Sequence, residues 1–312
     1  MTISSELFDI DRFKGCLLGM ACGDAVGTTV EFSPRGTFPP VTEMTGGGPF
    51  YLKAGKWTDD TSMALCLAHS LLYMKGFDAK DQMNRYLNWR DHGYMSSTGR
   101  CFDIGNTVNT ALNKYQSTQD PFAGSESPMT AGNGGIMRIA PVPMFYVEDI
   151  ESLLLYAGAS SRTTHGAPEA VECAKLFSAQ IRSALLGNSK DEVLLKADFS
   201  PTEEKVSAIC RGTYIEKTES QVKGSGYVVE ALEAALWCFY HTEGFEAAVL
   251  KAANLGDDAD TTAAIVGQIA GAYYGIEGIP QKWLSLLYQR EEIEGLATSL
   301  FNDRHKPRNK EI

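Results

Sequence analysis

The sequence predicts an all-α protein with a single domain over residues 1–312, and three observations lead to that prediction. Apolar residues recur at helical spacing along most of the chain, whereas the alternating pattern typical of strands is almost absent. Glycines recur every four residues from Gly15 to Gly27 and again from Gly267 to Gly275, so each set lies on one helical face. No linker separates two cores, and two similar acidic motifs near opposite ends of the chain can meet only within one domain.

The two glycine-bearing segments are predicted to be helices that pack against each other. A glycine inside a helix costs about 1 kcal/mol relative to alanine. Several glycines on one stripe therefore indicate that another backbone approaches closely there. The first helix is expected over residues 12–28 and contains Asp24, and its mate is expected over residues 261–274.

The remaining elements follow from the same helical spacing. Residues 33–57 are rich in Pro, Gly and Thr and predict a long functional loop, and residues 119–135 form a second glycine-rich loop. Residues 303–312 are expected to be a solvated tail. The further helices are predicted at 61–75, 79–91, a segment ending near 116, 150–161, 168–186, 202–211, 227–241, 245–254 and 282–300.

Composition narrows the class of protein. The net charge of −11 argues against a nucleic-acid surface, although a helix N-terminus or a metal ion can still hold an anionic small ligand. The seven cysteines are scattered without a CxxC pair, which argues for a reducing cytoplasm and against a cysteine zinc site. No membrane span or signal-peptide core is evident. We therefore expect a cytoplasmic monomer.

Two acidic motifs directly precede apolar helices, Thr58 to Ser62 (TDDTS) and Asp257 to Thr262 (DDADTT). Asp and Thr are preferred helix caps, so each motif alone can be interpreted as a cap. Capping needs only one or two side chains, and the chain supplies an excess in both places. Carboxylate and hydroxyl oxygens favour Mg²⁺, Mn²⁺ or Ca²⁺ over zinc or copper. Converging motifs would supply enough acids for two ions about 3.5–4 Å apart.

Four further positions each allow two interpretations. Glu31, at the exit of the first glycine helix, is either a general acid–base group or a solvated surface glutamate. Residues 133–135 (NGG) either present backbone N–H groups to a phosphate or form a plain tight turn. His165 is either a catalyst or a buried, hydrogen-bonded group, and Tyr227 either stacks on a base or is simply packed.

Seven stretches in order then resemble one family, the ADP-ribosylglycohydrolases, and the most similar type is the bacterial form that acts on ADP-ribosylated dinitrogenase reductase. One stretch alone is a weak signal, but the ordered set spans Gly15 to Gly275 and is specific. The stretches are GCLLGMACGDAVGTTVEF, GKWTDDTSMAL, CFDIGNTV, GNGGIMRIAPV, SSRTTHGAPEA, GSGYVVEAL and LGDDADTTAAIVGQIAG.

The resemblance implies an orthogonal bundle of helices with a cleft for two Mg²⁺ or Mn²⁺ ions. Glu31 matches the family's catalytic or substrate-positioning glutamate, and Asp257 stands where family members often have glycine, so it is expected not to bind metal. The implied metal ligands are Thr58, Asp59, Asp60, Asp258, Asp260 and Thr261. The implied ADP-ribose-binding residues are Asp103, Gly105, Asn133, Gly134, Gly135, Met137, His165 and Tyr227.

The expected activity is hydrolysis that removes ADP-ribose from a modified protein side chain, with arginine as the first choice of acceptor. Serine-linked ADP-ribose and O-acetyl-ADP-ribose remain alternatives. Two other classes also remain open: a binding protein that neutralises an ADP-ribosyltransferase partner by occupying it, and a metal phosphohydrolase acting on nucleotides. No P-loop or HExxH motif supports nucleotide hydrolysis or a zinc protease.

Elimination favours Glu31 as the general acid–base group. The six metal positions are committed to coordination, Asp24 lies inside a packed helix, and Asp257 adjoins the metal positions. Glu31 has a longer arm at a loop entrance, and Asp103 is better suited to hold the substrate's guanidinium through a charged hydrogen bond.

Overall fold

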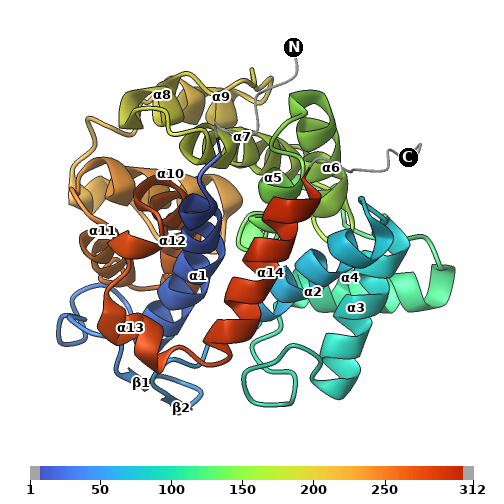
Figure 1. The fold of residues 1–312 in the computed structure, drawn as a ribbon, viewed down its shortest axis with the longest axis horizontal. Coiled ribbons are helices and arrows are strands. Elements are labelled where there is room, and N and C mark those ends of the chain that lie inside the picture. Colours follow the sequence, from blue (N-terminus) through green and yellow to red (C-terminus); the bar gives the residue numbers. More distant parts are fainter. Residues whose placement is uncertain (1–7, 305–312) are drawn as a thin grey trace.

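The computed structural model describes residues 8–304, and the described chain is a bundle of helices (Figure 1). The all-α prediction is confirmed, because the strands in the described part form one short hairpin, β1 (Gly46–Gly47) with β2 (Leu52–Lys53). The α-helices are α1 (Ile10–Gly27), α2 (Asp59–Met74), α3 (Ala79–His92), α4 (Asn106–Thr118), α5 (Pro141–Phe145), α6 (Ile150–Arg162), α7 (Pro168–Leu185), α8 (Lys190–Leu195), α9 (Glu204–Cys210), α10 (Val228–Tyr240), α11 (Phe245–Ala253), α12 (Ala259–Tyr274), α13 (Gln281–Leu286) and α14 (Arg290–Asp303).

Helices α1 and α12 lie side by side and antiparallel, in contact along their whole length. A Cβ atom on Gly19 would lie 2.5 Å from the carbonyl oxygen of Gly267, and one on Gly271 would lie 1.9 Å from that of Gly15. Real Cβ atoms essentially never come that close to a backbone. Only glycine permits this separation, so the predicted pairing of the two glycine helices is confirmed.

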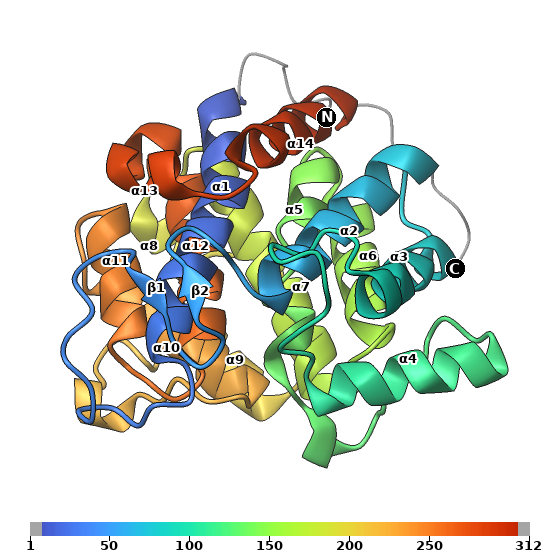
Figure 2. The same cartoon turned by 90° about the horizontal axis from the view of Figure 1, so that it is seen from below.

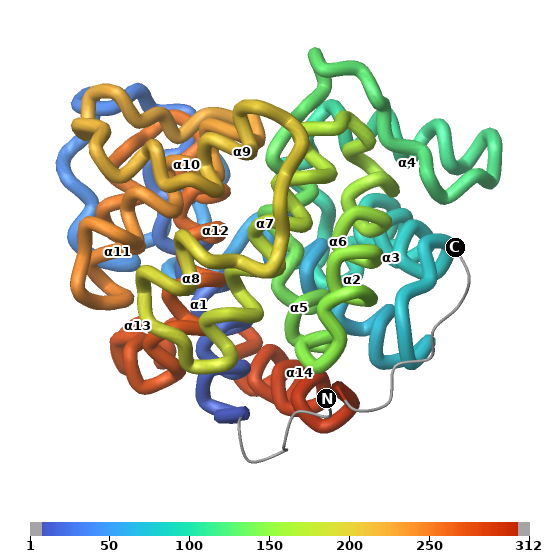
Figure 3. The backbone as a smooth tube through the Cα atoms, turned by 90° about the horizontal axis from the view of Figure 1, so that it is seen from above, coloured from blue at the N-terminus to red at the C-terminus, as the bar shows by residue number. Residues whose placement is uncertain are grey.

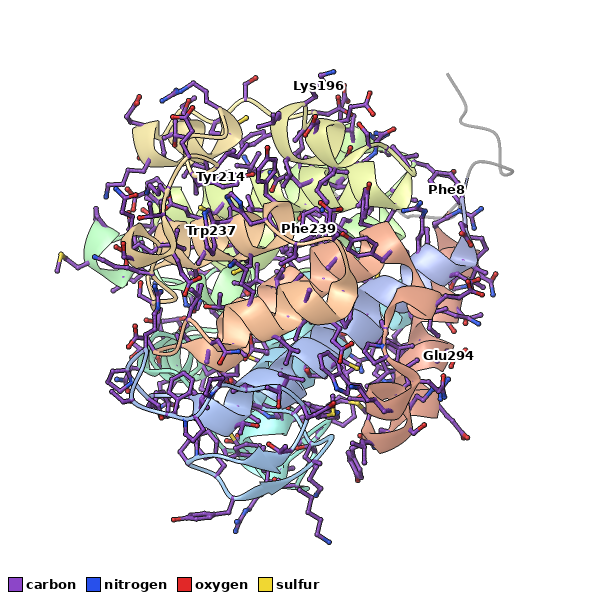
Figure 4. The ribbon with its side chains drawn as sticks, turned by 90° about the vertical axis from the view of Figure 1, so that its left-hand side faces the viewer. Phe8, Lys196, Tyr214, Trp237, Phe239 and Glu294 are labelled. Carbon is purple, nitrogen blue, oxygen red and sulfur yellow. The ribbon has the colours of Figure 1, made fainter. Side chains whose placement is uncertain are left out.

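The other helices fall into two groups around this pair. Figures 2 and 3 show α8, α10 and α11 on the side of α1 and α12, and α2, α3, α4 and α6 on the other side. One large hydrophobic core runs through both groups, and a smaller cluster around Tyr86, Trp89 and Leu112 packs α3 against α4. On α10, the ring of Phe239 meets the ring of Tyr273 of α12 edge to face, with centroids 5.4 Å apart (Figure 4).

Most predicted helices are present within one to three residues of their expected ends, but the helix expected over 282–300 is wrong. Two helices, α13 and α14, replace it, and Gln289 between them has a left-handed backbone with φ of 51°. The N–H of Tyr288 donates to the carbonyl of Gly55 at 2.9 Å. The break therefore serves as a docking point for the loop that carries the hairpin. Helices α5 and α8 and the hairpin were not predicted either.

The C-terminal end of the described part is packed against the rest of the protein. Asp303 is the last residue of α14, and Arg304 is buried with its guanidinium 3.9 Å from the centroid of the Phe301 ring. Residues 305–312 of the expected tail lie outside the described residues. Within 8–304, no helix combines the length and apolar character needed to cross a bilayer.

The close pairing of α1 and α12 makes a specific stability prediction. Gly267→Ala should lower the free energy of unfolding by about 1–3 kcal/mol, because its new methyl group would collide with the backbone of Gly19. Gly295→Ala is the matched control: this exposed glycine of α14 has open space around it, so the change should raise stability by roughly 0.5–1 kcal/mol. Urea unfolding would measure both, and a Gly267→Ala protein as stable as the wild type would contradict the close contact.

Candidate active site

The N-terminus of α2 is capped by a carboxylate from a different helix. Asp24 of α1 accepts hydrogen bonds from the backbone N–H groups of Thr58 and Thr61, at 2.8 and 3.0 Å. It also accepts from their two hydroxyls, at 2.9 and 2.6 Å. Thr58, the N-cap residue, makes no side-chain cap bond to its own helix. The cap of α2 therefore does not depend on Asp59 or Asp60.

The N-terminus of α12 shares this feature: the side chain of its N-cap residue does not cap the helix. Asp258 is the N-cap residue, yet its carboxylate makes no cap bond to α12. It accepts instead from the side-chain amide of Asn133 at 2.7 Å. The interpretation of the two acidic motifs as plain helix caps is therefore wrong.

The two acidic motifs converge, as the sequence predicted. The hydroxyl oxygen of Thr58 lies 3.1 Å from Oδ2 of Asp260, a residue 202 positions away, and 3.3 Å from Oδ2 of Asp60. Asp260 is shared by two groups of acids whose ligand oxygens lie within 4.8 Å of one another. The groups are Asp24 with Asp60 and Asp260, and Glu31 with Asp103 and Asp260.

The donor set fits a divalent cation. Buried oxygens of Asp60, Glu31 and Asp103 have no hydrogen-bond partner among the described residues. The Thr58 hydroxyl has one proton but lies within hydrogen-bond distance of oxygens from Asp24, Asp60 and Asp260. Carboxylates left unpaired at such distances repel one another, and oxygen-only ligands suit Mg²⁺ or Mn²⁺.

The pKa values of these acids are raised, as expected for buried carboxylates that lie close together. Burial, reinforced by the charge of Asp103, raises the pKa of Glu31 to about 9, and burial with the charge of Asp24 raises that of Asp103 to about 7. Burial raises the pKa of Asp24 to about 6 despite its four hydrogen bonds. The pKa values of Asp60 and Asp260 are also raised well above the usual range, by burial first and neighbouring carboxylates second. A positive charge nearby would lower these pKa values and favour the ionised carboxylates.

A cavity of about 340 Å³ opens over these acids. Thr58 and Asp60 are fully buried and do not line this cavity. The sequence-predicted residues that line it are Glu31, Asp59, Asp103, Gly105, Asn133, Gly134, Met137, His165, Asp258, Asp260 and Thr261. The lining residues that sequence reasoning missed are Phe32, Ile104, Asn106, Thr107, Val108, Gly132 and Gly226.

Two predicted substrate-binding residues lie elsewhere. Gly135 packs against the side chain of Ser161, where a Cβ atom would lie 2.6 Å from the hydroxyl oxygen. The Tyr227 hydroxyl accepts a hydrogen bond from Lys205 at 2.8 Å and contacts the carboxylate of Glu169, and Tyr227 lines a separate cavity of about 530 Å³.

His165 is held as a neutral, buried imidazole. Burial, with the charge of Arg138 second, lowers its pKa to about 3. The Thr164 hydroxyl accepts from Arg138 at 2.5 Å and lies within hydrogen-bond distance, 2.9 Å, of Nδ1 of His165. A Cβ atom on Gly134 would lie 2.5 Å from this ring. The predicted alternative of a buried, hydrogen-bonded histidine describes it.

Two buried polar residues that the sequence reasoning passed over position the loop after Gly132. The side-chain amide of Gln268 in α12 donates to the carbonyls of Ile136 and Met137, at 3.1 and 2.8 Å. Arg138 is fully buried and stacks on Tyr86, 4.7 Å from the ring centroid. A lone Gln inside an apolar helix and a lone Arg inside IMRIAP were the signals available.

A second, larger cavity adjoins the first. It measures about 840 Å³ and shares Asn106 and Thr107 with the cavity over the acids. Its other walls come from α4, the loop at 120–126, Thr130 and Arg162.

The fold and the cavity define an all-helical protein with an oxygen-only site suited to divalent cations. Comparison with known proteins gives its family: the chain belongs to the ADP-ribosylglycohydrolases, whose family model matches residues 5–310. The family resemblance predicted from the sequence is confirmed.

Individual relatives agree. The chain is 45% identical over 293 residues to "ADP-ribosylarginine hydrolase Tri1" of Pseudomonas putida strain GB-1, which covers 94% of this chain and 78% of that protein. It is 32% identical to "ADP-ribosyl-[dinitrogen reductase] glycohydrolase" of Rhodospirillum rubrum, over 91% of this chain and 92% of that one. A solved "ADP-ribosylglycohydrolase-related protein complex" superposes with a TM-score of 0.84 at 44% identity, covering 95% of this chain and 98% of that chain.

The raised carboxyl pKa values predict how the metal-free protein responds to pH. The folded state binds protons more tightly than the unfolded chain, so raising the pH through the values of Asp24, Asp103 and Glu31 (about 6, 7 and 9) should lower stability. We expect the chelated protein to lose about 2 kcal/mol or more of unfolding free energy between pH 5 and pH 9. Glu31→Gln should reduce the loss of unfolding free energy at the upper end of this pH range. Added Mg²⁺ should also reduce the loss. Stability that rises with pH in chelator would contradict the crowded acid group.

Proposed function

We propose that this protein is a metal-dependent hydrolase that removes ADP-ribose from modified arginine side chains of proteins. The observation that carries the proposal is the pair of acid groups that share Asp260, of which Glu31, Asp103 and Asp260 line a cavity. Membership of the ADP-ribosylglycohydrolase family supports it. The choice of arginine is supported by two relatives, at 45% and 44% identity, that are named ADP-ribosylarginine hydrolases.

The two acidic motifs would hold two Mg²⁺ or Mn²⁺ ions. We propose that Asp24 positions this site rather than binding metal, because both of its oxygens already accept hydrogen bonds from Thr58 and Thr61. When bound, divalent cations would supply Lewis acidity toward ribose hydroxyls and a water molecule. The proposed ligands are Thr58, Asp59, Asp60, Asp258, Asp260 and Thr261.

Glu31 is proposed as the acid–base group. Hydrolysis breaks the bond between the anomeric carbon of the ribose and a guanidine nitrogen, and a water oxygen takes that nitrogen's place on the carbon. The leaving nitrogen needs a proton, and the water gives one up. Glu31 lines the cavity with one buried oxygen that has no partner in the described chain, so it can move either proton. Asp103 belongs to the same acid group and is proposed to bind the guanidinium.

ADP-ribose would extend from the acids toward the loop at 132–137. The N–H of Asn133 already donates to the carbonyl of Gly226, so it would not be available to the phosphates. The adjoining cavity beyond Asn106 and Thr107 offers room for the adenosine half. Any contribution of Tyr227 would come from its ring, because its hydroxyl is already bonded.

The setting of the reaction is a narrower proposal. All seven cysteines are free, and five of them are buried, which suits the reducing cytoplasm. An ADP-ribosylated protein is the proposed partner. A monomeric state and a cognate ADP-ribosyltransferase stay predictions.

The central prediction concerns metal-dependent release of ADP-ribose. With Mg²⁺ present, the wild-type protein should release ADP-ribose from an arginine-modified protein faster than from a serine-modified one. Excess chelator should abolish release, and Asp260→Ala should do the same because that residue belongs to both acid groups. Glu277→Ala is a control: this acid follows α12 and lies outside both groups. Absence of release from both substrates with Mg²⁺ present would refute the proposal, and activity in chelator would refute the metal.

Conservative variants can separate the proposed roles of Glu31 and Asp103. Glu31→Gln should lower turnover about 10²–10⁴-fold, the usual contribution of general acid–base catalysis, while binding of free ADP-ribose stays near that of the wild type. Asp103→Asn should raise KM more than it lowers kcat. Steady-state kinetics and calorimetric titration with ADP-ribose would measure both. Wild-type turnover in Glu31→Gln together with lost turnover in Asp103→Asn would mean that the two roles are reversed.

A further inference from the structure

Three phenylalanine rings form a continuous row beside the cavity, and we call Phe32, Phe50 and Phe102 the aromatic rim. The ring centroids of Phe32 and Phe50 are 6.3 Å apart, and those of Phe50 and Phe102 are 5.2 Å apart, both edge to face. The three residues come from separate segments of the chain. Phe32 itself lines the cavity over the acids.

Phe32 is held in an unfavourable state. Its side chain is 65% exposed, and its backbone is left-handed with φ of 61°, a conformation that a bulky residue rarely adopts. Its N–H donates to the carbonyl of Asp257 at 2.8 Å, and the N–H of Asp257 donates to the carbonyl of Ser33 at 2.9 Å. The first residue of the second acidic motif, Asp257, therefore fixes the backbone of Phe32 in place. Strain and apolar exposure that the chain itself does not use point to a ligand at this position.

The hairpin fixes the second ring. Gly48 lies in its turn with φ of 65°, and a Cβ atom there would lie 2.0 Å from the carbonyl oxygen of Thr28. The turn therefore rests directly on the short helix Thr28–Val30, which leads into Glu31. Phe50 follows in the same turn, where the N–H of Tyr51 donates to the carbonyl of Gly48. A glycine-only contact thus sets the position of the rim relative to Glu31.

The rim is paired with acids in the chain itself. Phe32 directly follows Glu31, and Phe102 directly precedes Asp103. The carboxylate oxygens of these two acids lie within 4.8 Å of each other and of Asp260. A group that meets both features must combine a positive charge with a flat or apolar body. A guanidinium on its aliphatic stem has that combination, because it pairs with carboxylates and stacks on aromatic faces.

We propose that the aromatic rim receives the ADP-ribosylated arginine side chain of the substrate protein, and that Phe32 determines specificity for this acceptor. The inference rests on the proposed function. The adenosine half would lie toward Asn106 and Thr107, in the larger cavity, whose lining contains none of the three rim residues. The rim therefore discriminates between acceptors and does not hold the nucleotide.

Binding measurements test the rim independently of turnover. On a Glu31→Gln background with Mg²⁺, Phe32→Leu keeps an apolar side chain but loses the π face. We expect it to weaken binding of an ADP-ribosyl-arginine peptide about 5–30-fold, the range that corresponds to a cation–π contact. Binding of free ADP-ribose should change by less than about twofold. Phe32→Trp should restore peptide binding, and Leu155→Ala, at a 52% exposed apolar residue of α6 that lines neither cavity, should change the affinity for neither ligand.

The outcomes separate this inference from the proposed function. Release of ADP-ribose by the wild-type protein tests the proposed hydrolase function. The ratio of the affinity for the peptide to the affinity for free ADP-ribose tests whether the rim binds the arginine side chain. A peptide-to-ADP-ribose affinity ratio that is unchanged in Phe32→Leu would overturn the proposal for the rim. If both affinities fall by the same factor, Phe32 contacts ADP-ribose instead of the arginine side chain. If thermal melting shows that Phe32→Leu does not fold, Phe102→Leu, which removes the other end of the row, provides the same comparison.

Discussion

The structure depends on the direct backbone contact between α1 and α12. Because glycines line both helices, their axes come closer than side chains would normally allow. At the end of this contact a Cβ atom on Gly27 would lie 2.5 Å from the Cα atom of Asp260. The acids of α12 are thereby brought beside Asp24 of α1, and Asp24 in turn holds the start of α2 through four hydrogen bonds. One close helix pair thus positions both acidic motifs.

Stability and function oppose each other at this point. Burial and mutual repulsion raise the pKa values of the acids, so the folded chain without cations is weakened where the site lies. The tight glycine contact and the apolar helices around it must supply the compensating stability. Arg138 contributes a buried positive charge nearby, although its direct partners are Thr164 and the face of Tyr86 rather than a carboxylate. Bound cations would relieve the remaining repulsion.

The sequence predicted the features that repeat or cluster along the chain. The four-residue spacing of glycines gave the helix pair, and the excess of Asp over what a cap requires gave the converging acids. It could not predict that Asp24 caps α2, because that bond joins two helices that only the fold brings together. The hairpin was missed because two-residue strands containing Gly46 and Gly47 have no alternation to detect. The break at Gln289 was missed because its cause is a distant loop carbonyl.

The aromatic rim is another feature that the sequence could not predict, because only the fold brings its three residues together. In the sequence, Phe32, Phe50 and Phe102 lie far apart in loops, and nothing in their spacing distinguishes them from core residues. The fold makes them a row, and backbone contacts hold two of the three loops: Asp257 fixes Phe32, and the hairpin turn that leads to Phe50 rests on Thr28. A change in the loops could therefore alter which side chain is accepted without moving the acids. The acids would remain set by α1 and α12.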